Sequence, residues 1–128
     1  MESVGTATGT KTKRVLVVDD SAFMRHTIAK ILQADPELEV VGEARDGEEG
    51  LALAAALRPD VVTLDVEMPR MDGLTMLGKL MCEQPMPVVM LSTLTQAGAS
   101  ATLEALDLGA VDFVPKPRSG RSSELVEV

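Results

Sequence analysis

Residues 60–65, with the sequence DVVTLD, form a short apolar run that ends in a carboxylate. A run this short and this rich in valine predicts a β-strand. Because its interior is almost unbroken in hydrophobicity, the strand is predicted to lie inside a parallel sheet that is covered on both faces. Two similar runs, Arg14–Asp19 (RVLVVD) and Pro87–Ser92 (PVVMLS), predict two further central strands.

Two more runs contain polar breaks and predict the edges of the same sheet. Glu39–Ala44 (EVVGEA) is broken by Glu43, and Val111–Pro115 (VDFVP) is broken by Asp112. In chain order, a helical pattern follows each of the first four of these five runs. We therefore expect an α/β protein with a doubly wound, five-stranded parallel sheet. The strand order is then 2-1-3-4-5, with a topological switch point between the carboxyl ends of the first and third strands.

The predicted helices have apolar residues on one side. Asp20 or Ser21 is the expected N-cap of the first helix, and Pro36 follows its end. The apolar face of the first helix is predicted to consist of Phe23, Met24, Thr27, Ile28, Ile31 and Leu32. The later helices are predicted over about Gly47–Arg58, Leu74–Glu83 and Gln96–Leu108, with Gly109 ending the last one.

The length of 128 residues predicts one domain. Residues 1–12 are predicted to be a flexible tail and residues 13–117 the folded domain. Residues 118–128 are predicted to be the start of a linker or a truncated last helix, because a complete fold of this kind has a fifth helix after Pro117. The chain is therefore expected either to be cut from a longer protein or to have an incomplete last helix.

Composition excludes several classes of function. A net charge of −8 and the absence of Trp and Tyr argue against nucleic-acid binding. No apolar run is long enough for membrane insertion, and the first residues lack the apolar core of a secretion signal. The lone Cys82 cannot form an internal disulfide, which fits the cytoplasm. Its neighbours Leu80 and Met81 predict a buried or half-buried thiol.

Three aspartates are predicted to meet at the switch point. Asp19 and Asp20 follow the first strand, and Asp65 ends the third. Each alone is explained by a helix cap, a strand end or a turn. Together, two charges about 4 Å apart repel by roughly 4 kcal/mol at an effective dielectric constant of about 20, so an ionised cluster needs a cation. Carboxylates without nearby His or Cys predict Mg²⁺.

The residues around this cluster suit a phosphoryl group. Pro69 and Asp72-Gly73 mark a tight loop that is predicted to hold Asp65 at the rim and to offer a backbone carbonyl to the metal. Ser92 and Lys116 follow the neighbouring strands; alone, each has the ordinary explanation of a strand-end serine or a solvated lysine. Together with the aspartates they predict that Asp65 accepts a phosphoryl group, whose oxygens Mg²⁺, Lys116 and the hydroxyl neutralise or bind.

This combination resembles the receiver domain of two-component response regulators. The resemblance covers Lys13–Pro117 and rests on Asp19-Asp20, Asp65, Ser92, Phe113 and Lys116-Pro117, in that order. It implies a flavodoxin-like fold and Mg²⁺ held by Asp19, Asp20, Asp65 and the backbone carbonyl of Glu67. It also implies that Ser92 and Lys116 bind phosphoryl oxygens and that Phe113 changes rotamer with phosphorylation. Whether the Glu67 side chain faces the cluster is left open.

Three longer stretches resemble the receiver half of the chemotaxis protein-glutamate methylesterase family. They are LDVEMPRMDG (64–73), PMPVVMLS (85–92) and LEALDLGAVDFVPKP (103–117). The resemblance implies phosphorylation by a chemotaxis histidine kinase, control of an attached methylesterase domain, and chemoreceptors as indirect partners. The esterase serine, histidine and aspartate are not in this chain, so we do not expect the chain itself to be the esterase.

Two other functions share parts of this pattern. A phosphatase of the haloacid-dehalogenase type needs a second acid two residues after the nucleophile, together with a cap domain, whereas Val66-Glu67 follows Asp65 here. A stand-alone receiver would act as a phosphate shuttle or bind a motor, but the polar stretch 118–128 favours a linker to an output domain. His26 lies off the apolar stripe of the first helix and is expected to be a solvated residue.

Overall fold

The computed structural model describes residues 12–68, 71–92 and 104–116. The predicted tail and the stretch 118–128 lie outside these ranges, apart from residue 12. The strands are β2 (Lys13–Val18), β3 (Leu38–Ala44), β4 (Val61–Asp65), β5 (Val88–Ser92) and β6 (Asp112–Pro115). They form one parallel sheet in the order β3-β2-β4-β5-β6, which is 2-1-3-4-5 along the chain. The predicted fold, strand order and edge strands are therefore confirmed.

Burial follows the hydrophobic pattern of the strands. All of β5 is buried, and so is β4 apart from its first residue, whereas the edge strands β3 and β6 each have a single buried residue. Val-rich central strands lose water from both faces, and this burial drives the sheet together. The carboxyl ends of β4 and β5 are thus held by strands that are almost entirely buried.

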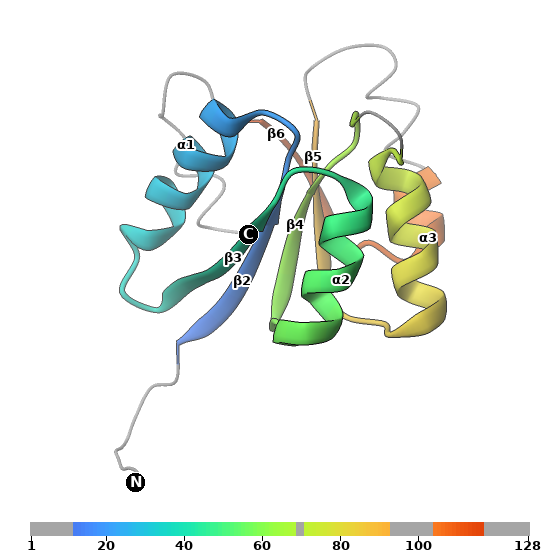
Figure 1. Ribbon diagram of the computed structural model, residues 1–128, viewed down its shortest axis with the longest axis horizontal. Coiled ribbons are helices and arrows are strands. Elements are labelled where there is room, and N and C mark those ends of the chain that lie inside the picture. Colours follow the sequence, from blue (N-terminus) through green and yellow to red (C-terminus); the bar gives the residue numbers. More distant parts are fainter. Residues whose placement is uncertain (1–11, 69–70, 93–103, 117–128) are drawn as a thin grey trace, which may run out of the picture.

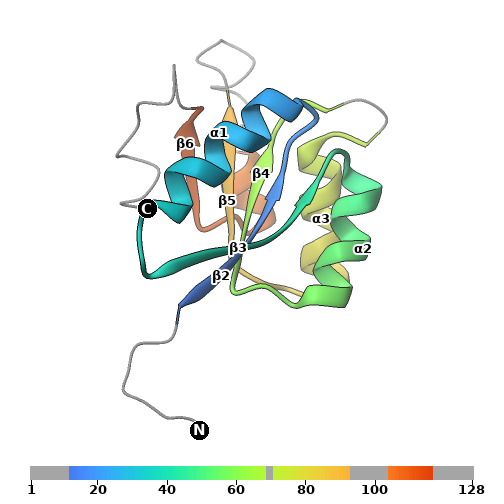
Figure 2. The same ribbon diagram turned by 60° about the vertical axis from the view of Figure 1, so that its left-hand side comes forward.

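Helices cover both faces of the sheet. Helix α1 (Ala22–Gln33) lies on one face, and α2 (Gly47–Leu57) and α3 (Gly73–Glu83) lie on the other (Figures 1 and 2). Residues 104–108 are also helical and carry the end of the predicted fourth helix. The part of that prediction over residues 96–103 lies outside the described residues. None of the described helices combines the length and hydrophobicity that crossing a membrane requires.

Side chains and glycine set the ends of the helices. Ser21, Asp46 and Asp72 each accept a hydrogen bond from the backbone N–H three residues later, at 3.1, 2.8 and 2.8 Å. These caps satisfy N–H groups that have no partner inside the helix. Gly109 has a φ of 115° and lies directly after the 104–108 helix, as its predicted role as a stop signal requires.

Two separate cores hold the layers together. The larger lies between the sheet and the α2–α3 face, and includes Leu16, Val62, Leu64, Met76, Leu77, Leu80 and Met90. The smaller lies under α1 and consists of Val15, Val17, Ile28, Leu32, Val89, Leu91 and Val114. Alternate residues of each strand face opposite cores, as the two-residue period of a strand dictates.

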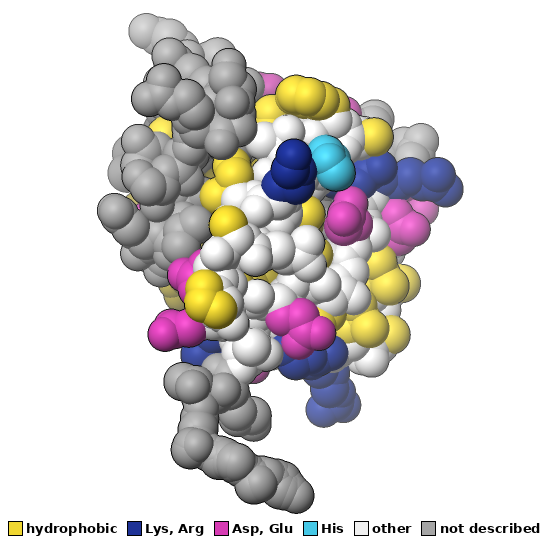
Figure 3. Space-filling view, turned by 90° about the vertical axis from the view of Figure 1, so that its left-hand side faces the viewer, with side chains coloured by type: hydrophobic (Ala, Val, Ile, Leu, Met, Phe, Trp, Pro, Cys, Tyr) yellow, Lys and Arg dark blue, Asp and Glu magenta, His cyan; other side chains and the backbone are white. Residues whose placement is uncertain are grey.

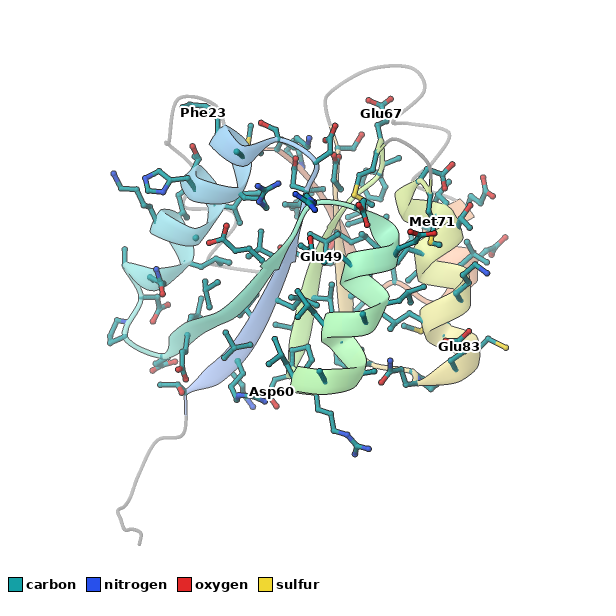
Figure 4. All side chains as sticks on the ribbon, in the orientation of Figure 1. Phe23, Glu49, Asp60, Glu67, Met71 and Glu83 are labelled. Atoms are coloured by element: carbon teal, nitrogen blue, oxygen red, sulfur yellow. The ribbon has the colours of Figure 1, made fainter. Side chains whose placement is uncertain are left out.

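Two sequence predictions about burial are wrong. Phe23 is 70% exposed at the outer end of α1 (Figure 4). At about 100° per residue it lies about 140° around the helix from the buried Ile28, so it points away from the sheet. Cys82 is exposed as well, because α3 turns Met76, Leu77 and Leu80 inward. His26 is exposed as predicted and lies among charged side chains on the α1 face (Figure 3).

Candidate functional site

The ends of β2 and β4 bring the three aspartates together. Asp19 directly follows β2 and is fully buried, and Asp65 ends β4 and is 2% exposed. Asp20 is exposed beside them. Each residue offers a carboxylate oxygen, and these three oxygens lie within 4.8 Å of one another. The sequence prediction that these side chains cluster is confirmed; their role in binding a metal stays a prediction.

Backbone contacts hold Asp19 in a fixed position. Its N–H donates to the carbonyl of Ala44 on β3 at 3.0 Å, and its Oδ1 accepts from the N–H of Ser21 at 2.9 Å. Its carbonyl oxygen accepts a hydrogen bond from Arg25 Nη1 at 2.7 Å. No role for Arg25 was expected from the sequence. The available signal was an arginine in the first turn of a helix that begins three residues after a buried acid.

The Lys116 side chain extends from the end of β6 to contact two of the aspartates. Its Nζ lies 3.2 Å from Asp19 Oδ2 and 3.1 Å from Asp65 Oδ1. Its backbone N–H donates to the carbonyl of Ser92 at 2.8 Å, so the chain after β6 continues the ladder with β5. The side chain is 16% exposed, and its ammonium group partly neutralises a buried pair of carboxylates.

Burial and charge act in opposite directions on these three groups. Burial, helped by the charge of Asp19 and opposed by Lys116, raises the pKa of Asp65 to about 7. Burial also raises the pKa of Asp19, although the Ser21 N–H and Lys116 favour its charged form. Burial disfavours the charged ammonium of Lys116, but the attraction of Asp65 and Asp19 outweighs this effect, and its pKa is raised. The raised pKa values of both aspartates indicate that Lys116 offsets only part of the cost of burying two carboxylates side by side.

The donor set fits a hard divalent cation. Asp65 Oδ1 contacts Lys116 and accepts from the N–H of Glu67 at 3.3 Å, whereas Asp65 Oδ2 is buried without a hydrogen-bond partner among the described residues. A buried carboxylate oxygen without a partner is costly unless an incoming ligand satisfies it. Asp19, Asp20 and Asp65 supply the oxygens that Mg²⁺ prefers.

Glu67 lies at the rim of this cluster. Its side chain is exposed at the end of the molecule where the carboxyl ends of the strands lie (Figure 4). Together with Asp20, Met68 and Asp72 it lines an open hollow beside the aspartates. Whether the Glu67 side chain faces Asp19 and Asp65 stays an open question. The role of its carbonyl as a metal ligand stays a prediction.

The loop after Asp65 is closed by Gly73. Its N–H donates to the carbonyl of Val66 at 2.8 Å. A Cβ atom at this position would overlap the carbonyl oxygen of Asp65 itself. The sequence predicts only a turn at Gly73, whereas the structure shows that the backbone of the candidate acceptor Asp65 excludes a side chain there. Pro69, the other predicted loop marker, lies outside the described residues.

Ser92 lies on β5, the strand next to the strand β4 that carries the candidate acceptor, and Phe113 lies on the edge strand β6. Ser92 ends β5 and is 3% exposed. Phe113 lies on β6 opposite Met90 and is half-buried against the larger core. Strand β5 therefore separates Phe113 from the strand that carries Asp65. Their predicted roles, in phosphoryl binding and in a rotamer switch, stay predictions.

The chain is similar to known proteins over nearly its whole length. A family model described as the response regulator receiver domain matches residues 15–127. The protein-glutamate methylesterase/protein-glutamine glutaminase of Pyrococcus abyssi is 59% identical over 115 residues, which make up 90% of this chain and 31% of that protein. The protein of the same name from Moorella thermoacetica is 62% identical over 109 residues, 85% of this chain and 26% of that protein. The chain thus spans under a third of these relatives.

Two solved structures illustrate the similarity of fold. The response regulator domain of Thermotoga maritima CheB matches with a TM-score of 0.79 and 47% identity, covering 92% of this chain and 88% of that chain. The CheX-CheY-BeF3-Mg+2 complex from Borrelia burgdorferi matches with a TM-score of 0.75 and 32% identity, covering 86% of this chain and 82% of that chain.

Proposed function

The chain belongs to the response regulator receiver family, and on that premise we propose that it is the phosphorylation-controlled receiver of a chemotaxis methylesterase. Asp65 is the phosphoryl acceptor. The observation that carries this assignment is its buried Oδ2, which lacks a hydrogen-bond partner among the described residues and lies on a carboxylate whose other oxygen is already held by Lys116.

The phosphodonor is a phosphohistidine of a chemotaxis histidine kinase. Asp65 Oδ2 attacks phosphorus, the bond from phosphorus to the imidazole nitrogen breaks, and the electron pair of that bond stays on the imidazole. The product is an acyl phosphate on Asp65, so neither oxidant nor further co-reactant is needed. Lys116 and the Ser92 hydroxyl then bind the phosphoryl oxygens. Because such a kinase draws its phosphoryl group from ATP, we place the chain in the cytoplasm.

Mg²⁺ is the cofactor that this donor set fits, held by Asp19, Asp20, Asp65 and the backbone carbonyl of Glu67. When bound, it neutralises charge on the transferred phosphoryl group. Asp65 must be ionised to attack, and a nearby divalent cation lowers the pKa of a carboxyl that burial has raised. The name of the Borrelia burgdorferi complex places Mg²⁺ and a beryllofluoride with a CheY-type receiver, which supports the same pairing here.

The output is control of a methylesterase domain. The curated relatives carry that activity in their names, and this chain matches less than a third of each of them. We therefore assign the esterase chemistry, and the chemoreceptors it acts on, to the remainder of such a protein. The receiver's own part is to accept and hold the phosphoryl group.

Intact-mass spectrometry tests the acceptor. With Mg²⁺ and a small phosphodonor such as acetyl phosphate, the parent chain is expected to gain one phosphoryl group, and Asp65→Asn none. Asp107→Asn is the matched control because it removes one exposed carboxylate from the 104–108 helix. An Asp65→Asn chain that gains a phosphoryl group at the parent's rate contradicts the proposal.

A further inference from the structure

Arg25 contacts several parts of the chain next to Asp19 and Asp20. It lies in the first turn of α1, where its own N–H donates to the carbonyl of Ser21 at 2.9 Å. Its Nη1 donates to the carbonyl oxygen of Asp19 at 2.7 Å. Its Nε lies 3.7 Å from Glu43 Oε1 on the edge strand β3. One guanidinium therefore links α1, the corner after β2, and β3.

The carbonyl that Arg25 holds belongs to the peptide unit between Asp19 and Asp20. A peptide unit is planar, so fixing this oxygen also fixes the amide nitrogen of Asp20 and the direction in which its chain leaves. Asp19 has further anchors in Ala44, Ser21 and Lys116. Asp20 is exposed, and among the described residues nothing holds its carboxylate. The position of Asp20 therefore depends on its backbone.

The positive charge of Arg25 lies close to the candidate cation site, where it is unfavourable for metal binding. The side chain is only 19% exposed and donates to a residue of the candidate cation site. A positive charge at this place repels a divalent cation, so electrostatics alone would disfavour an arginine here. Its geometric contribution has to outweigh that repulsion if the site binds metal well.

We propose that Arg25 is a positioning residue for the metal site, acting through the Asp19–Asp20 peptide unit to hold the Asp20 carboxylate where it can bind Mg²⁺. This inference rests on the proposed function, because it assumes a Mg²⁺ site at the aspartates. Outer contacts that orient metal ligands typically change metal affinity by about 10–100-fold when removed.

Calorimetric titration with Mg²⁺ tests the proposal on the parent chain, Arg25→Met, Arg25→Lys and Arg45→Met. Arg45 is the matched control, because it is exposed and its ion pair is with Glu49 on the surface. Arg25→Met is expected to weaken Mg²⁺ binding about tenfold or more. Loss of positive charge alone would strengthen binding, so the sign separates positioning from charge. Arg45→Met is expected to bind Mg²⁺ as well as the parent chain or slightly better.

Arg25→Lys separates geometry from charge in a second way. Lysine keeps the charge but has one compact donor group in place of the planar fork, so it is expected to recover only part of the lost affinity. Full recovery of parent affinity by Arg25→Lys contradicts the proposal. If Arg25→Met fails to fold, the Arg25→Lys chain alone decides: weaker binding than the parent supports positioning, and equal binding overturns it.

Measuring the free energy of unfolding without metal completes the design. If Arg25→Met is less stable but has the parent's dissociation constant for Mg²⁺, the role of Arg25 is purely structural and the proposal is wrong. In that case the proposed function stands, because the parent still binds Mg²⁺ and Asp65 still accepts phosphoryl. If the parent binds no Mg²⁺, the proposal also falls, and the intact-mass experiment on Asp65 reports separately on the proposed function.

Discussion

Asp65 meets two opposing requirements. As the proposed phosphoryl acceptor it has to be ionised to attack phosphorus, yet it is almost fully buried beside Asp19, and its pKa is about 7. Lys116 offsets part of this cost through its 3.1 Å contact with Asp65 Oδ1. A nearby divalent cation would offset more, so the metal-free site is the less favourable state for an ionised carboxylate.

The pKa of Asp65 predicts how the stability of the metal-free protein depends on pH. The pKa is raised from 3.8 to about 7 on folding, so the folded chain holds this proton more tightly than the unfolded chain. The stabilising contribution is complete below the unfolded pKa and is lost as pH rises through the folded pKa. The free energy of unfolding in chelator is therefore expected to fall between about pH 4 and about pH 8.

Chemical denaturation followed by circular dichroism, at several pH values in chelator, measures this slope. Asp65→Asn should have a shallower slope, with the remainder due to Asp19, whose pKa is raised in the same direction. Saturating Mg²⁺ should also reduce the slope in the parent chain, because the metal favours the ionised carboxylate. A parent and an Asp65→Asn chain with the same pH profile would show that Asp65 does not titrate in this range.

The first residue of helix α3 packs directly against the backbone of Asp65. Gly73 is the first residue of this helix, and its missing side chain leaves room for the carbonyl oxygen of Asp65. Gly78 lies inside the same helix with open space where a Cβ would stand. Packing therefore requires glycine at position 73 but not at position 78, and alanine substitutions at the two positions should have different effects.

Gly73→Ala is expected to lower the free energy of unfolding by about 2 kcal/mol or more and to weaken Mg²⁺ binding, because the backbone of Asp65 has to move. Gly78→Ala is expected to raise the free energy of unfolding by about 0.5–1 kcal/mol, because alanine is the better helix former. Denaturation midpoints and Mg²⁺ titrations of both chains check this. Equal effects of the two substitutions would contradict the packing argument at Gly73.

Across the whole molecule, the site is connected to the sheet edge through β5 and β6. Lys116 contacts Asp65 with its side chain and bonds the carbonyl of Ser92 with its backbone. Phe113 lies on β6, half-buried against the larger core. Leu106 and Val111 are exposed nearby in sequence, at 46% and 60%. A shift of Ser92 and Lys116 toward a phosphoryl group therefore has a short physical route to this edge.

Beryllofluoride with Mg²⁺ mimics the phosphorylated state and tests that route. Amide NMR shifts or hydrogen exchange are expected to change most at Ser92–Ala99 and Val111–Lys116, because we propose that phosphorylation favours a conformer in which Phe113 turns inward. A bias of about 1.4 kcal/mol changes the ratio of conformers tenfold. Changes confined to Asp65–Gly73 would show that Ser92 and Phe113 do not carry the signal.

The strand order and the clustering of the aspartates followed from hydrophobic runs that end in polar residues. Those properties are periodic or local, and the carboxyl ends of parallel strands must meet. The exposure of Phe23, the contact of Arg25 with Asp19 and the exclusion of a side chain at Gly73 did not follow from the pattern. Each depends on the angle at which a helix leaves its strand and packs on the sheet. Such angles arise from contacts between segments far apart in the chain, so no local pattern encodes them.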